Sequence, residues 1–254
     1  MQGTRTLEMG GSRRFAGTPL FGRRRSGAAE PRRAEVAAVL ALSAIALALR
    51  LTSLSRSLFT DEAYSLALAQ RSFGHMLGLF GYEANGTAYA VVLWPVVHIF
   101  GEAAAVIRAP AVAAGVASVP ALWWAARRFA GPAAALLAAA LLAINPMSVF
   151  YGHQARPYAF VILAACVAFG ALVRAAERPE GVGWWAVYAV AMTLTTYSET
   201  LAAVLVLPAH ALLVLRAPAA ARRRWLLALG AVLILCVPLI VASAIERSRR
   251  NPLY

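Results

Sequence analysis

Long uninterrupted apolar segments restrict what this chain can fold into more than any other feature. A helix needs roughly 20 apolar residues to cross a bilayer. The first such segment covers residues 34–51, and several more follow it along the chain. Hydrophobic residues make up 61% of the sequence, which is more than the core of a water-soluble protein of this size would bury. The sequence therefore predicts an all-α polytopic membrane protein.

Basic residues are concentrated near the N-terminus. All 24 basic residues are arginines, and eight of them lie in residues 1–33 among glycine, proline and serine. This composition predicts a disordered tail that stays in the cytoplasm, followed by an uncleaved signal anchor at 34–51. We expect no nucleic-acid partner, because the arginines are explained by membrane orientation.

The positive-inside rule sets the number of crossings. If every apolar segment crossed, Arg127-Arg128 and Arg174 would lie on the outer face, against that rule. The segment Thr87–Phe100 has only 14 residues, about 21 Å of helix at 1.5 Å per residue, which is too short for a ~30 Å hydrocarbon core. We therefore predict that this segment is interfacial or re-entrant.

With this exception, the sequence predicts seven crossings and two flanking regions. The module covers 34–245, an outer loop with interfacial helices covers 52–102, and residues 246–254 begin a further outer loop where more protein is expected. The predicted crossings are 34–51, Ala103–Ala126, Pro132–Tyr151, Tyr158–Val173, Trp184–Tyr197, Thr200–Leu215 and Trp225–Ile245.

Two adjacent carboxylates, Asp61 and Glu62, follow the first crossing in a chain with only 11 acidic residues. A carboxylate at a membrane rim can take a proton from a hydroxyl or hold a cation. Alternatively, Thr60 is a helix N-cap, and both acids simply complement the helix dipole in the first turn. The local sequence does not decide between these interpretations.

A polar, aromatic turn at 145–158 separates two apolar segments and carries Arg156. A guanidinium at the outer rim either grips a phosphate or extends toward lipid headgroups, and Arg108 has the same two alternatives. Two such arginines opposite two carboxylates predict an anion site. His153 and Gln154 are candidate ligands or acid-base groups, although each taken singly is better explained as an interfacial polar residue.

Several short motifs occur in an order and spacing that resemble a known family. The chain resembles polytopic glycosyltransferases of the C superfamily, specifically the family 39-like enzymes related to protein O-mannosyltransferases and lipid A aminoarabinose transferases. The motifs are Arg50-Leu51, Thr60-Asp61-Glu62-Ala63-Tyr64-Ser65, Glu83-Ala84-Asn85-Gly86-Thr87-Ala88-Tyr89, Phe100-Gly101, Ile107-Arg108-Ala109-Pro110, Asn145-Pro146 and Gln154-Ala155-Arg156-Pro157-Tyr158.

The resemblance implies a reaction and an assignment of roles. The donor would be a sugar on a polyprenyl phosphate, and transfer to an acceptor hydroxyl would invert the sugar's configuration. Asp61 would be the base, and Glu62 would orient the acceptor or bind a divalent cation, Mg or Mn, where one is used. Arg108 and Arg156 would hold the lipid phosphate. The residues implied to line the sugar or acceptor site are Asn85, Tyr89, His153, Gln154 and Tyr158.

The resemblance also leaves several points open. Residues 85–89 lack the His or Pro pair that often precedes the family's tyrosine, so sugar and acceptor (protein, lipid or glycan) are not specified. Family members are typically about twice as long, which leaves an inactive fragment or a scaffolding membrane partner as an alternative. A transporter or flippase would instead need ionisable residues near mid-membrane. The expected location is the plasma membrane, with a cytoplasmic N-terminus and the active site on the outer face.

Overall fold

The structure, a computed structural model, describes residues 32–52, 54–81 and 84–250, and most of them are helical. No strand occurs in this described part of the chain. The predicted tail at 1–33 lies outside the described residues except for its last two, and Arg33 already begins the first helix. The predicted all-α class is confirmed.

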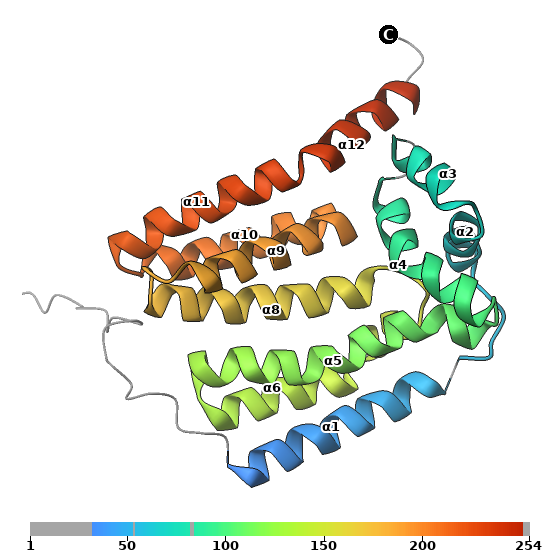
Figure 1. The fold of residues 1–254 in the computed structure, drawn as a ribbon. Helices are drawn as coiled ribbons and strands as arrows, with labels where there is room; N and C mark the ends of the chain where they lie inside the picture. Colours follow the sequence, from blue (N-terminus) through green and yellow to red (C-terminus); the bar gives the residue numbers. More distant parts are fainter. Residues whose placement is uncertain (1–31, 53, 82–83, 251–254) are drawn as a thin grey trace, which may run out of the picture.

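Seven segments run back and forth along one axis and form an elongated bundle (Figure 1). Three of its helices, α1, α5 and α8, are each long and apolar enough to cross a membrane alone. The helices of the bundle are α1 (Arg33–Leu51), α5 (Ala104–Ala130), α6 (Pro132–Ile144), α7 (Pro146–Tyr151), α8 (Tyr158–Glu177), α9 (Val182–Ser198), α10 (Thr200–Leu215), α11 (Ala219–Leu235) and α12 (Val237–Arg250). Among the described residues, the number of candidate spans rises to four if α11 and α12 form one bent span, and the seven crossings stay a prediction.

The predicted crossing Pro132–Tyr151 is interrupted, which corrects the sequence-based boundary. α6 ends at Ile144, and Asn145 caps α7 by accepting a hydrogen bond from the Ser148 N–H at 3.0 Å. Pro146 explains the break, because proline lacks an N–H and disfavours a helical conformation in the residue before it. The break turns the chain at the end of the bundle where α5 begins.

The last predicted crossing, Trp225–Ile245, is also two helices. α11 and α12 meet at Cys236 with a bend of 45°. Pro238, in the first turn of α12, has no N–H to continue the helical hydrogen bonds, which accounts for the bend. α12 extends to Arg250, so residues 246–250, where the sequence predicts the start of an outer loop, are helical. Residues 251–254 lie outside the described residues.

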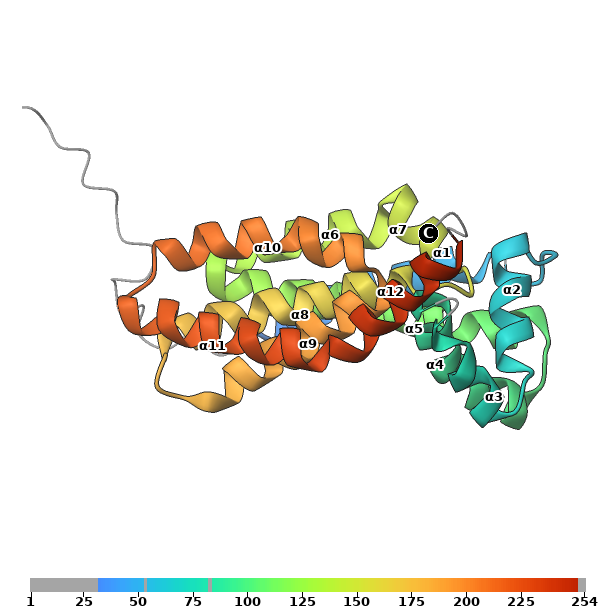
Figure 2. The same ribbon diagram turned by 90° about the horizontal axis from the view of Figure 1, so that it is seen from above.

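A group of helices lies across one end of the bundle, which we call the outer end. It comprises α2 (Thr60–Ala69), α3 (Phe73–Gly78), the 3₁₀ turn η1 (Leu79–Gly81) and α4 (Ala84–Phe100). Figure 2 shows this group beyond the ends of the long helices. α4 thus lies in this group and not among the bundle helices, and its interfacial position in a membrane stays a prediction.

Small residues allow the central helices of the bundle to approach closely. Ala168 and Ala171 of α8 are fully buried, and a Cβ at Gly170 would overlap the ring of Trp124 on α5. In a membrane, such van der Waals contact replaces the hydrophobic drive for association. The bundle thus becomes a rigid support for the helices at its outer end.

Arginines occupy the opposite end of the bundle, where α1 starts. Arg127 pairs with Glu35 at 2.8 Å, and Arg128 pairs with Glu177 at 2.5 Å. Arg174 lies 3.6 Å from the centre of the Trp124 ring. These basic residues face the predicted cytoplasmic side, in keeping with the positive-inside rule.

Candidate functional site

Both acidic residues lie at the N-terminus of α2, at the outer end of the bundle. α2 begins at Thr60, and the N-cap is Phe59, so Thr60 is not the N-cap that one of the two interpretations of the sequence proposed. A Glu62 carboxylate oxygen instead accepts the Phe59 N–H at 3.0 Å. The first turn is a favourable place for both negative charges, because the helix dipole is positive there. The two side chains nevertheless have opposite environments.

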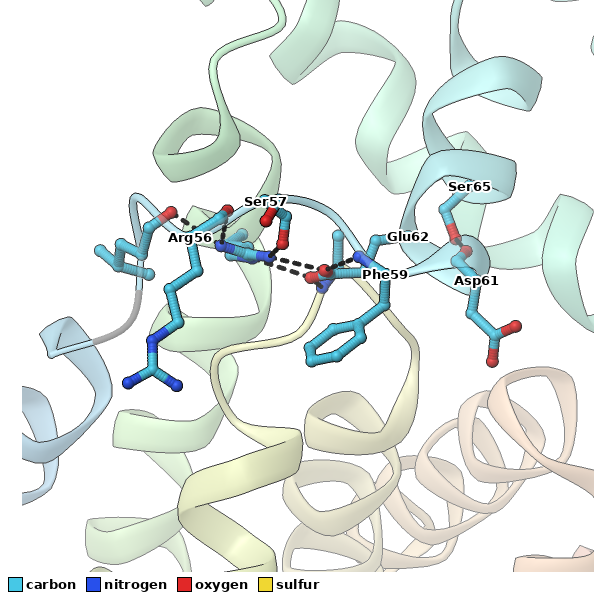
Figure 3. A network of polar contacts seen from close by, with 9 residues as sticks. Arg56, Ser57, Phe59, Asp61, Glu62 and Ser65 are labelled. Carbon is cyan, nitrogen blue, oxygen red and sulfur yellow. Dashed lines mark hydrogen bonds and ion pairs between the residues drawn. The ribbon is translucent and has the colours of Figure 1, made fainter.

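Glu62 is buried and locked in place (Figure 3). Its side chain is 1% exposed and receives two hydrogen bonds from Arg108, at 2.8 and 2.6 Å. A third bond comes from the Ala155 N–H at 2.9 Å. Burial alone would raise the pKa of Glu62, but Arg108 and the two backbone N–H groups outweigh it and hold the pKa below its ordinary value. Dashed lines in the figure converge on this carboxylate.

Arg108 uses its whole guanidinium within the protein. Besides Glu62, it donates to the carbonyls of Leu54, Arg56 and Ser57 at 2.8 to 3.2 Å, and the residue is 1% exposed. These bonds tie α5 to the loop that leads from α1 to α2. Such contacts favour a structural role for Arg108, in contrast to the phosphate binding expected from the sequence.

Asp61 is the exposed member of the pair. Its side chain is 71% exposed, and its carboxylate lies apart from the Glu62 network in Figure 3. A guanidinium nitrogen of Arg156 lies 3.9 Å from a carboxylate oxygen of Asp61. Asp61 and Arg156, which are 95 positions apart in the sequence, are therefore brought together in an accessible position.

Arg156 is placed by the turn between α7 and α8. The Ala155 N–H binds Glu62, so the residue before Arg156 is attached directly to the start of α2. The guanidinium lies 5.7 Å from the centre of the Tyr158 ring, and its Nε is buried without a hydrogen-bond partner. The exposed part of this guanidinium, on a side chain that is 22% exposed, can donate to an anionic ligand.

Tyr89 and His153 add polar groups near the same carboxylate. Tyr89 is 3% exposed, and its hydroxyl has no hydrogen-bond partner. Burial raises the pKa of Tyr89, and the charge of Glu62 raises it further. Burial lowers the pKa of His153, which keeps its ring neutral near pH 7. The buried tyrosine hydroxyl is therefore a neutral hydrogen-bonding group without a partner among the described residues.

The other residues predicted to line the sugar or acceptor site are Gln154, Tyr158 and Asn85. Gln154 is 9% exposed, and its backbone carbonyl accepts the Arg156 N–H. Tyr158 lies with its ring centroid 4.6 Å from that of Tyr151. Asn85 belongs to the first turn of α4, and its side chain lies outside the described residues.

A divalent cation does not fit the Glu62 carboxylate. Both oxygens already accept hydrogen bonds from Arg108 and the backbone, and metal ligation would have to displace them. Among the described residues, no group of three or more His, Cys, Asp or Glu side chains could hold a metal ion.

Sequence reasoning gave no role to Arg50, a fully buried arginine at the end of α1. Its guanidinium donates to Ser148 on α7, close to the turn that carries Arg156. The sequence did contain a signal, namely an arginine within an apolar helix, which is costly in a membrane unless it has partners.

Comparison with known protein families gives a match for this chain. A family model described as dolichyl-phosphate-mannose-protein mannosyltransferase matches residues 85–243, which is more than half of the chain. The match includes Arg108 and Arg156 but begins after the Asp61-Glu62 pair. No individual curated protein and no solved structure gives a significant match. The resemblance stated from the sequence is thereby confirmed, and the chain belongs to the dolichyl-phosphate-mannose-protein mannosyltransferase family of C-type membrane glycosyltransferases.

Proposed function

We propose that the protein transfers a sugar from a polyprenyl-phosphate donor to an acceptor hydroxyl at the outer face of the membrane, with inversion and with Asp61 as general base. The observation that carries this proposal is the difference in environment between the two adjacent acids. Glu62 is buried and has no free oxygen, whereas Asp61 is exposed beside Arg156. Only Asp61 can meet an incoming hydroxyl.

The proposed reaction needs one proton acceptor and one anion site. Asp61 takes the proton as the acceptor oxygen forms a bond to the anomeric carbon. The bond from that carbon to the phosphate oxygen breaks on the opposite face of the sugar, and the electron pair leaves with the polyprenyl phosphate. Arg156 stabilises the leaving phosphate, because its guanidinium lies beside Asp61 and is partly exposed.

Glu62 and Arg108 support this arrangement without touching the substrates. Their buried pair joins three segments: the start of α2, the start of α5 and the turn that carries Arg156. We propose that this pair fixes the relative position of the base and the anion site. A positioning error of about 1 Å in such a site can cost roughly a hundredfold in rate.

An apolar groove is a candidate site for the isoprenoid chain of the donor. It has a volume of about 820 Å³ and lies between α10, α11 and α12, with Leu207, Val232 and Leu239 among its lining residues. Ser243 and Arg247 line it on α12, toward the outer end. An apolar groove with a cation at its outer mouth matches a lipid with a phosphate head. We propose that the isoprenoid chain of the donor lies here, with its phosphate at the outer mouth of the groove near Arg247.

The orientation follows from the arginines at the end where α1 begins. Arg127, Arg128 and Arg174 all lie at that end, so the positive-inside rule favours a cytoplasmic N-terminus. The acidic pair then faces the outside of the plasma membrane. The acceptor class (protein, lipid or glycan) is left open by these observations.

The test of the proposed function is Asp61→Asn in the intact chain within membranes. We expect a loss of sugar transfer of roughly 10²- to 10⁴-fold, the usual contribution of a general base, with insertion and donor binding retained. Glu102→Gln is a matched control, because Glu102 is another exposed acid at the outer end. Near-normal transfer by Asp61→Asn, measured with a radiolabelled polyprenyl-phosphate sugar, would refute the assignment of Asp61 as base.

A further inference from the structure

Arg50 is fully buried without a carboxylate partner among the described side chains. Its guanidinium donates to the Ala46 carbonyl at 3.0 Å and to the Ala143 carbonyl at 3.5 Å. It also donates to the Ser148 carbonyl and hydroxyl at 3.1 and 2.8 Å. An unpaired charge buried at the rim of a membrane is costly. A neutral residue of similar shape would avoid this cost, so the charge needs an explanation.

The partners of Arg50 lie on both sides of the helix break in the third crossing. Ala143 is in the last turn of α6, and Ser148 is in α7. The Pro146 break leaves carbonyls at the end of α6 without their usual helical partners. Arg50 therefore bridges the two helices and determines the direction of α7 as it leaves α6.

Two glycines make room for this guanidinium. A Cβ at Gly115 of α5 would lie 2.7 Å from the Arg50 Nε, and a Cβ at Gly152, just after α7, would come closer still. The Arg50 Nε itself is buried without a hydrogen-bond partner. The arginine thus occupies a notch between α5 and the start of the turn that carries Arg156.

We propose that Arg50 is a positioning residue for the donor phosphate. It holds α7 and Gly152, and these set the turn in which Ala155 binds Glu62 and Arg156 approaches Asp61. Its positive charge, close to this turn, also favours an anion there. The expected kinetic effects of changing Arg50 rest on the proposed function. The effect of Arg50 on the position of α7 does not.

The primary experiment compares Arg50→Gln and Arg50→Lys with the parent chain in nanodiscs. Arg56→Gln is the matched control, because it removes an exposed positive charge from the same end, and Figure 3 shows its guanidinium pointing away from the network. Spectra of a spin label on Met147, an exposed α7 residue, report the order of α7 in a background with Cys166→Ala and Cys236→Ala. Transfer kinetics with a polyprenyl-phosphate sugar are measured in parallel.

We expect Arg50→Gln to increase the mobility of the Met147 label and to lower kcat/KM for the donor roughly 10- to 100-fold, mainly through the donor KM. A variant that merely failed to fold would lower kcat by reducing the active fraction and would leave this KM unchanged. Arg50→Lys should rescue part of both effects, because one ammonium can still reach Ser148 but loses the fork that spans both helices. Arg56→Gln should behave like the parent.

A second variant covers the case in which Arg50→Gln does not accumulate. Gly115→Ala keeps the arginine but displaces it, so it should loosen α7 and raise the donor KM in the same direction. Unchanged label mobility in both variants would overturn the positioning role. If the parent shows no transfer while Arg50→Gln still loosens α7, the proposed function fails and the positioning role of Arg50 stands.

Discussion

The buried pair of Glu62 and Arg108 offers a direct test of whether Arg108 is a structural anchor or a phosphate ligand. Arg108→Ala would leave the Glu62 carboxylate 1% exposed with only backbone donors, and would release three carbonyls of the loop before α2. Breaking one partner of a buried ion pair costs about 3–5 kcal/mol. For a chain of this size, this corresponds to a decrease in Tm of about 6–20 °C, at 2–4 °C per kcal/mol.

The assay is thermal unfolding in detergent, followed by tryptophan fluorescence. Arg156→Ala is the matched control, because the side chain of Arg156 is 22% exposed and its nearest carboxylate is 3.9 Å away. It should change stability by no more than about 0.5–1 kcal/mol. Arg108→Met combined with Glu62→Leu should cost less than Arg108→Ala alone, because no buried charge is then left unpaired.

The outcome that would refute this reasoning is equally specific. If Arg108→Ala retained the Tm of the parent and lost only donor binding, the guanidinium would be a phosphate ligand and the bonds to Glu62 would be incidental. If the double replacement cost as much as the sum of the single ones, the two side chains would not be coupled. Either result would require the site to be rebuilt without the anchor.

Three further predictions concern the anion site, the groove and pH. Arg156→Lys should weaken polyprenyl-phosphate binding by about 1–3 kcal/mol, because lysine keeps the charge but loses the fork of donors; equal binding in an equilibrium assay would make Arg156 a headgroup anchor only. Ala203→Trp should fill the groove and raise the donor KM, whereas Leu212→Trp, on an exposed face of the same helix, should not. The lowered pKa of Glu62 means that its stabilising effect is complete above the ordinary carboxyl pKa of about 4.3 and is lost as pH falls through the folded-state pKa. The Tm difference between the parent and Glu62→Gln should therefore shrink on acidification, and a constant difference would contradict the pair's role.

The apolar segments and the placement of arginines were enough to predict the all-α membrane class, which the structure confirms. The seven crossings and the interfacial position of the segment ending at Phe100 stay predictions. These features depend on properties that can be read along the sequence, namely the length of apolar segments and the positions of charged residues. A segment must be long enough to span the hydrocarbon, and arginines stay on the cytoplasmic side. The end of α6 was missed because Pro146 interrupts a segment whose hydropathy continues on both sides of it.

The environments of the site residues are decided only by tertiary packing. Asp61 and Glu62 are adjacent acids with the same local preferences, yet one is exposed and the other is buried against Arg108, a partner 46 positions away. Arg108 and Arg156 looked equivalent in the sequence, but the donors of Arg108 are used by Glu62 and three carbonyls. The burial of a charge depends on which distant groups can satisfy it, and the sequence alone does not contain those distances.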